Sequence, residues 1–259
     1  MKRYVHGGYV MKMAKKIICI LGWLALVPAV FAQTQTVQKK QTDSEKSESS
    51  VEDEYLSDVD GIVILGLAAS DEYENKLYAM QMLEAAVDGG NTTPDVMKAL
   101  NMLAGEGINN QSRMNGRLIN NFPDIRRRAC LALGKVKTEE SKNYLLQVTT
   151  AENEPMVIAA AVNSLGEIGI NNNDEVVNAI AFANRRNQIL NPTSSLAAEV
   201  IDCYAKLADS TENKKSLIDS LTQIASDYHY NKTVRNNALK LLKSISTSGS
   251  SSAGEGEAK

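Results

Sequence analysis

Hydrophobic residues recur along the middle of the chain at the spacing of one helix face. The clearest set is Ile125, Ala129, Leu133 and Val136, which stand at positions i, i+4, i+8 and i+11. Because an α-helix completes a turn in about 3.6 residues, these side chains point the same way. Alternation with a period of two, which a half-buried strand would show, is not evident between residues 58 and 246. The pattern therefore predicts helices and no strands in this region.

The same helix face returns several times along the chain. Copies start at Ile125, Val157, Leu196 and Val234, so consecutive copies are 32, 39 and 38 residues apart. A degenerate earlier copy starts at Asn75. The remaining members of the other copies are Ala161, Leu165 and Ile168; Val200, Tyr204 and Leu207; Ala238, Leu242 and Ile245; and Ala79, Leu83 and Ala86. Repetition at this period is typical of a helical solenoid.

A second helix is predicted between consecutive copies. The candidates are amphipathic and cover residues 95–103, 139–148, 174–189 and 213–228. Prolines stand near predicted helix starts, where a missing N–H costs little, at Pro94, Pro123, Pro155 and Pro192. The repeating unit is therefore a hairpin of a first and a second helix. One hairpin cannot bury its own apolar face, but a stack of hairpins can.

These units resemble HEAT repeats. The best copy reads Pro-Asp-Ile-Arg at 123–126, then Ala129, then Leu-Gly-Lys-Val at 133–136. The resemblance implies an all-α fold, a right-handed α-solenoid of about five helical hairpins, with the second helices lining its concave face. It also implies that the basic residue at Arg126 and Arg235, with Lys76 as a further candidate, belongs to the scaffold. Gly134 and Gly166 are expected to let the next helix approach closely.

The two ends of the chain differ from the repeats. Residues 1–32 have the layout of a secretory signal peptide, with three lysines before an apolar run at 17–27 and cleavage expected after Ala32. That run is short for a membrane span, which needs about 20 apolar residues, so an uncleaved anchor is the alternative and no membrane span is expected after cleavage. The sequence leaves the translation start open among Met1, Met11 and Met13.

Polar segments flank the predicted repeat domain. Residues 33–57 and 247–259 are rich in Ser, Thr, Gln, Glu and Gly and have little apolar surface to bury, so we expect a disordered spacer and a disordered tail. The repeat domain then covers residues 58–246. Within it, residues 105–122 lengthen one repeat. We interpret them as a polar loop or a decayed helix, with an insertion that shapes a binding face as the alternative.

Net charge and composition limit the functions that we expect of this protein. Removal of residues 1–32 takes away five basic residues and no acidic ones, which leaves 23 basic against 31 acidic residues and a net charge of −8. Such a surface repels phosphate backbones, so nucleic acid is not expected as a partner. Cys130 and Cys203 remain, and we expect buried free thiols on first helices two repeats apart, too distant for a disulfide.

Candidate chemistry is sparse. None of the common catalytic or metal-binding motifs occurs, and His229 is the only histidine left after residue 32. We interpret His229 as a surface residue in a turn. The acidic pairs at 71–72, 139–140 and 174–175 open predicted helices, where negative charge is stabilising. No cofactor or metal is therefore expected, and the chain is not expected to be an enzyme.

One polar cluster suggests a binding surface. Asn184, Arg185, Arg186 and Gln188 lie late on a second helix. Arginines at such a place could bind carboxylates or phosphates of a partner, although stabilisation of the helix C-terminus by cations explains them equally well. The sequence thus predicts an exported, non-catalytic scaffold for a protein partner in the periplasm or cell envelope, with secretion as the alternative. A repeat enzyme, a lyase or a small-ligand-binding protein is the alternative function.

Overall fold

The computed structural model describes residues 51–109 and 111–251, which belong to one compact unit. The elements in these residues are, in order, α1 (Val51–Ala69), α2 (Tyr73–Asp88), α3 (Pro94–Ala104), β1 (Arg113–Met114), β2 (Arg117–Leu118), α4 (Pro123–Lys135), α5 (Glu139–Ala151), α6 (Pro155–Ile168), a 3-10 turn η1 (Asn172–Asp174), α7 (Glu175–Leu190), α8 (Ser194–Leu207), α9 (Lys215–Ser226) and α10 (Lys232–Ser251). The expected signal peptide 1–32 lies outside the described residues. So do most of the expected spacer 33–57 and part of the expected tail 247–259.

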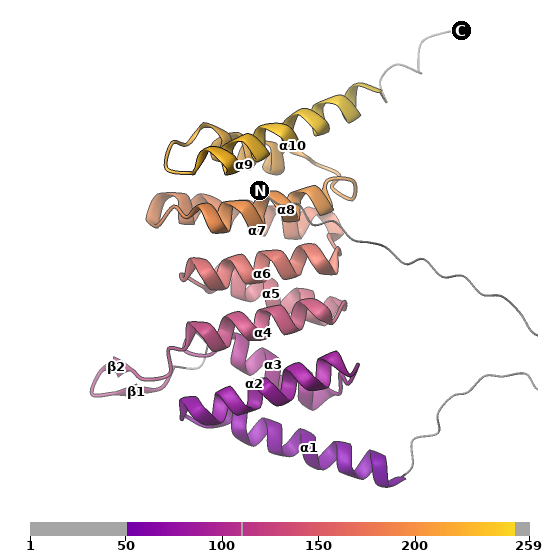
Figure 1. The fold of residues 1–259 in the computed structure, drawn as a ribbon, viewed down its shortest axis with the longest axis vertical. Helices are drawn as coiled ribbons and strands as arrows, with labels where there is room; N and C mark the ends of the chain where they lie inside the picture. The colour runs from indigo at the N-terminus through magenta and orange to yellow at the C-terminus, as the bar shows by residue number, and fades with distance from the viewer. Residues whose placement is uncertain (1–50, 110, 252–259) are drawn as a thin grey trace, which may run out of the picture. The chain divides into compact units, whose positions relative to one another are not determined.

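The helices stack in two layers, in the order of the sequence (Figure 1). In the first-helix layer, α4 packs on α2 and α6, and α8 packs on α6 and α10. In the second-helix layer, α3 packs on α1 and α5, and α7 packs on α5 and α9. Each helix also packs on its neighbour in the chain. The all-α class and the stacked hairpins that the periodicity predicted are therefore confirmed.

The predicted helix faces form the core. Every member of the copies that start at Ile125, Val157 and Leu196 is buried. In the degenerate first copy, Ala79 and Leu83 are buried as predicted, whereas Asn75 and Ala86 are only half-buried. The buried residues of α2 are Lys76, Ala79, Met80, Leu83 and Val87. This helix packs on α1 as well as on α3 and α4.

Gly134 and Gly166 stand where successive first helices touch, as predicted. A Cβ atom on Gly134 would lie 2.5 Å from Oγ and 2.9 Å from Cα of Ser164, on α6. A Cβ atom on Gly166 would lie 3.1 Å from Cα of Cys203, on α8. The Ser164 hydroxyl uses the close approach to donate a hydrogen bond of 2.9 Å to the Cys130 carbonyl. These glycines set the spacing of the first-helix layer.

The prediction of no strands is wrong at one place. Residues within the 105–122 segment form a two-stranded antiparallel hairpin, with Arg113 opposite Leu118 and Met114 opposite Arg117. Its two-residue turn is Asn115-Gly116, and both residues have positive φ, at 51° and 81°. This dipeptide is the usual sequence signal for such a turn, and it is independent of the helix periodicity on which the prediction rested. The hairpin extends from the side of the stack (Figure 1).

The helices extend beyond the predicted domain boundaries. Helix α1, which the sequence did not predict, begins at Val51 instead of after residue 57. Helix α10 continues past residue 246, and the Ser246 hydroxyl donates to the Leu242 carbonyl one turn earlier. None of the described helices combines the length and the apolar character that crossing a bilayer requires.

Candidate functional site

Three of the four predicted binding residues hold α7 in the stack. Asn184 is buried and its Nδ2 donates to Oγ of Ser220 on α9, at 3.0 Å. The guanidinium of Arg186 donates to the backbone carbonyls of Thr150 and Glu152, at the end of α5. Gln188 Nε2 donates to Oδ2 of Asp227, just after α9, at 2.8 Å. These contacts leave the side chains little freedom to bind a partner.

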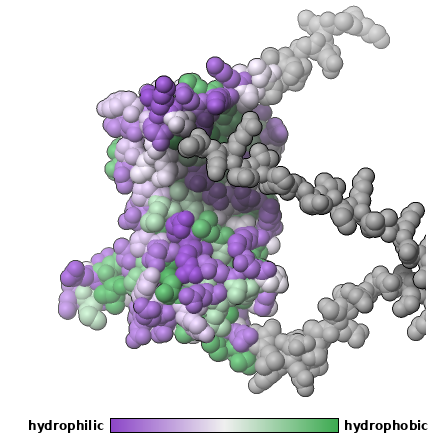
Figure 2. All heavy atoms as spheres, viewed as in Figure 1, coloured by the Kyte–Doolittle hydropathy of each residue, from purple (hydrophilic) through white to green (hydrophobic). Residues whose placement is uncertain are grey.

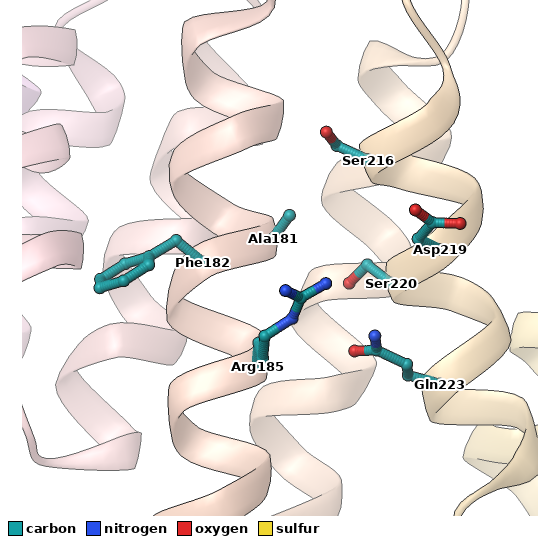
Figure 3. A pocket seen from close by; sticks show the side chains of 7 residues that line it. All are labelled: Ala181, Phe182, Arg185, Ser216, Asp219, Ser220 and Gln223. Atoms are coloured by element: carbon teal, nitrogen blue, oxygen red, sulfur yellow. The ribbon is translucent and has the colours of Figure 1, made fainter.

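Arg185 differs from its neighbours. Its side chain is exposed and has neither a hydrogen bond nor an ion pair with any of the described residues. It reaches from α7 toward α9, above a groove of about 220 Å³ (Figure 3). Asp219 stands on the α9 side of the same groove, also without an ion pair to the described residues. The groove therefore presents one uncompensated guanidinium and one uncompensated carboxylate.

Small side chains create this groove. Ala181 on α7 faces Ser216 and Ser220 on α9, and Gln223 closes one end (Figure 3). These side chains are too short to fill the space between the two helices at the surface, so a groove remains there. The direction of Arg185 follows from helix geometry, because it lies four positions after Ala181, which lines the same groove.

An apolar line crosses the second-helix layer beside the groove. Leu146, Phe182 and Ile218 lie on α5, α7 and α9, each 36 residues after the previous one. Phe182 is 56% exposed and points away from α9 (Figure 3). The guanidinium carbon of Arg186 lies 5.7 Å from the centre of its ring, a cation–π contact that fixes the ring. The constant spacing of 36 residues is the sequence signal by which these three residues could be predicted.

A second groove lies in the first-helix layer. It measures about 310 Å³ and runs across α4, α6 and α8. Arg127 lines it, exposed and without an ion pair to the described residues, and Met156 is 49% exposed beside it. Glu199 on the other side accepts a hydrogen bond of 2.9 Å from Asn163 Nδ2. Of the three adjacent arginines 126–128, Arg127 is therefore the one that the described contacts do not hold, since Arg126 pairs with Glu152 and Arg128 with Glu84.

Part of this stack matches a known protein family. Residues 117–183 match the family model described as HEAT repeats. This segment is similar to HEAT repeats. The match begins in β2 and ends within α7, so it includes Phe182 and stops just before Arg185. Neither the curated proteins nor the solved structures gave a match to the chain.

Two of the repeat units hold a basic residue in a buried ion pair. Arg126 on α4 is 2% exposed, and its Nε lies 2.6 Å from Oε2 of Glu152, which directly follows α5. In the preceding unit, Lys76 on α2 lies 2.9 Å from Oε2 of Glu106, two residues after α3. Each pair joins the start of a first helix to the end of its own second helix. As predicted, these basic residues are scaffold.

The remaining candidate chemistry is also structural. His229 lies exposed in the turn before α10, and its Nδ1 lies 2.7 Å from Oδ1 of Asp227. Asp174 is buried and accepts the backbone N–H groups of Glu212 and Asn213, which binds the start of α7 to the loop before α9. Among the described residues, no group of three or more His, Cys, Asp or Glu side chains gathers as a metal ion would require.

Cys130 and Cys203 are free and buried, and burial raises the pKa of each thiol to about 12. We expect neither thiol to react with Ellman's reagent at pH 8 in the folded protein, whereas both react after unfolding in urea. Because the unfolded thiols ionise near their ordinary pKa of about 8.5 and the folded ones do not, stability falls as pH rises above that value.

A Ser195→Cys variant supplies the control for this labelling. Ser195 is exposed beside the second groove, so its thiol reacts in the folded state. Rapid labelling of Cys130 or Cys203 in the folded protein would contradict the described packing of α4 and α8.

Proposed function

We propose that the chain is a non-catalytic scaffold that binds a protein partner through the groove between α7 and α9. The observation that carries this proposal is the exposed, unpaired guanidinium of Arg185 above that groove. HEAT repeats generally serve as protein-interaction scaffolds, and the matched segment ends at this place. Of the four predicted binding residues, Arg185 contacts the partner in this proposal. Asn184, Arg186 and Gln188 hold α7 in position.

The surface around Arg185 combines the contacts that protein interfaces use. A guanidinium binds a carboxylate in a bidentate, directional manner. The exposed ring of Phe182 on α7 and the exposed Ile218 on α9 supply apolar area, and aromatic residues and arginine dominate the affinity of many interfaces. Asp219 would repel a partner carboxylate that is misplaced. We therefore expect the partner to offer an acidic side chain next to an apolar one.

The alternative is a small ligand or substrate in the same groove. Its volume of about 220 Å³ lies below the usual range of about 300–1,000 Å³ for small-molecule sites, and the groove is open to solvent. The groove also offers no histidine or cysteine among its lining residues. These features favour a protein surface over a substrate pocket as the occupant.

Capture from the source organism tests the proposal. The full chain serves as bait, and bound proteins are identified after mild cross-linking. An Arg185→Glu variant reverses the charge in the proposed groove. Arg127→Glu is the matched control, because Arg127 is also exposed, unpaired among the described residues and placed on a groove, but on the first-helix layer.

We expect a partner that wild type and Arg127→Glu retain and that Arg185→Glu loses, with binding of the purified partner weakened about 10- to 100-fold. A partner lost only with Arg127→Glu would move the site to the first-helix layer. Equal retention by all three proteins would refute both grooves. Absence of any protein partner, together with saturable binding of a small compound lost in Arg185→Glu, would support the alternative.

We also propose that the chain is exported to the periplasm or cell envelope. The support is the basic and apolar layout of residues 1–32. The expected product begins at Gln33, and the mass of the intact protein recovered from the envelope or medium checks this. A chain that retains residues 1–32 would instead support the uncleaved anchor.

A further inference from the structure

Hydrophilic side chains cover much of the face of the stack that is seen in Figure 2, so a charged residue alone does not mark a binding site. In the first-helix layer, charges on adjacent helices pair with one another. Salt bridges of this kind join Arg128 to Glu84, Lys135 to Asp88 and Lys206 to Glu167. Opposite charges that lie on adjacent helices and stay unpaired therefore depart from the pattern of this stack.

Arg185 and Asp219 depart from it in this way. They lie on the adjacent helices α7 and α9, line the same groove and are both exposed. Neither forms an ion pair with the other or with any further described residue, and this includes Lys215, one turn before Asp219 on α9. In Figure 3 the guanidinium of Arg185 points toward α9, whereas the carboxylate of Asp219 points away from it. The groove therefore keeps a cation and an anion apart.

The repeats do not require these two charges. The position five residues after a fully buried core residue of α5, α7 and α9 holds Thr150, Arg185 and Thr222, counted from Leu145, Ile180 and Leu217. The hydroxyls of both threonines donate to a carbonyl one turn earlier in their own helix. Counted in the same way, the position after two residues holds Gln147, Phe182 and Asp219. Neither charge recurs on the neighbouring helices, so neither belongs to the common scaffold.

The size of the groove limits what can bind there. Its lining runs from Ala181 to Arg185 on α7 and from Ser216 to Gln223 on α9. At about 1.5 Å per residue, these stretches are about 6 and 10 Å long. An extended chain advances about 3.3 Å per residue, so two partner residues that reach the two charges are a few positions apart in sequence. One short segment of a partner can therefore supply both counter-charges.

The neighbouring Asp219 favours a carboxylate over a phosphate as the ligand of Arg185. The sequence leaves both anions open for these arginines. A phosphorylated side chain carries a charge of about −1.5 to −2 at pH 7, which Asp219 repels more strongly than the single charge of a carboxylate. Phosphate sites also commonly use a cluster of arginines, whereas this groove is lined by one. The groove thus matches a singly charged anion beside a cation.

We infer that the partner places a short segment in this groove that carries one acidic and one basic side chain a few residues apart. The acidic side chain binds Arg185 and the basic side chain binds Asp219. The inference rests on the proposed binding of a protein partner in the groove and names the chemistry of the contacting segment. A phosphorylated segment or a uniformly acidic one does not fit, because Asp219 repels its second negative charge.

Selection from a display library of random linear peptides tests the inference. The full chain serves as bait in four forms, which are wild type, Asp219→Lys, Arg185→Glu and Arg127→Glu. All three positions are exposed, and circular dichroism checks that the variants fold. We expect wild type and the control Arg127→Glu to enrich peptides with both charges. Asp219→Lys should enrich peptides in which an acidic residue replaces the basic one, and Arg185→Glu should enrich peptides with a second basic residue.

Synthetic versions of one enriched peptide measure the two contacts separately. Replacing its basic residue by Ala should weaken binding to wild type about 3- to 10-fold, as measured by fluorescence anisotropy. The same replacement should change binding to Asp219→Ala little, because that contact is already lost. Replacing the acidic residue of the peptide by phosphoserine should also weaken binding to wild type, and by less in Asp219→Asn.

Different outcomes would overturn different parts of the proposal. Equal peptide composition with wild type and Asp219→Lys would show that Asp219 contacts no ligand, and equal or tighter binding of the phosphoserine peptide would remove the preference for a carboxylate. If wild type enriches no peptide while Arg185→Glu still loses the captured partner, a folded surface binds the groove, so this inference fails and the proposed function stands. If wild type and Arg185→Glu enrich the same peptides and retain the same partner, both fail.

Discussion

Replacing Glu152 by Ala is expected to lower the free energy of unfolding by about 3–5 kcal/mol, the usual loss when one member of a buried ion pair is removed. Glu152 is 3% exposed, and its Oε1 also accepts the backbone N–H groups of Asn153 and Glu154, which open α6. The substitution leaves the charge of Arg126 buried without its carboxylate. Urea denaturation followed by circular dichroism measures the change.

Asp88→Ala is the matched control for this prediction. Asp88 also pairs with a basic residue of α4, but the side chains of Asp88 and Lys135 are 58% and 54% exposed. An exposed pair contributes about 0–1 kcal/mol, because water and salt screen it. Equal losses in the two variants would show that Glu152 is not buried against Arg126 as described.

Leu165→Ala is expected to cost about 2–5 kcal/mol, the sum of lost apolar burial and of the cavity that remains. Leu165 is fully buried on α6, the helix that packs on α4 on one side and on α8 on the other. Glycine contacts hold α6 at a close distance from both neighbours, so these helices cannot readily collapse into the space. The midpoint of urea unfolding reports the loss.

Met156→Ala on the same helix provides the comparison. Met156 is 49% exposed, so its truncation removes little buried surface and leaves no cavity. We expect a change below about 1 kcal/mol. An unchanged unfolding midpoint in Leu165→Ala would refute the register of the repeats, because that register places Leu165 in the core.

The candidate site could be predicted only in part. The sequence indicated that residues 184–188 end a second helix and carry polar side chains, and the structure agrees. Which of these side chains is free to bind a partner depends on the hydrogen-bond acceptors that other segments of the chain place beside them. Arg186 donates hydrogen bonds to backbone carbonyls that lie more than thirty residues earlier in the sequence. Asn184 donates to a hydroxyl that lies more than thirty residues later. Periodicity along one helix carries no information about such partners.

The hairpin and α1 were missed for different physical reasons. The hairpin depends on two residues with positive φ, a local signal that a search for helix faces does not weigh. Helix α1 lacks an apolar face of the repeat type, since Val59, Ile62 and Val63 are exposed and only Ile64 and Ala68 are buried deeply. The face toward α3 tolerates Gly61, which further obscures the pattern.

The sequence by itself determined the helical class, the repeat and most of the core, because in a stack of hairpins each buried face recurs at a nearly constant interval. Gly134 and Gly166 could be assigned to helix contacts on the same ground. Only the tertiary structure decided that Arg185 and Asp219 are unpaired among the described residues, whereas Asn184 and Arg186 are held by other segments. Those properties depend on which neighbour is present at a position, and residues far apart in the sequence supply that neighbour.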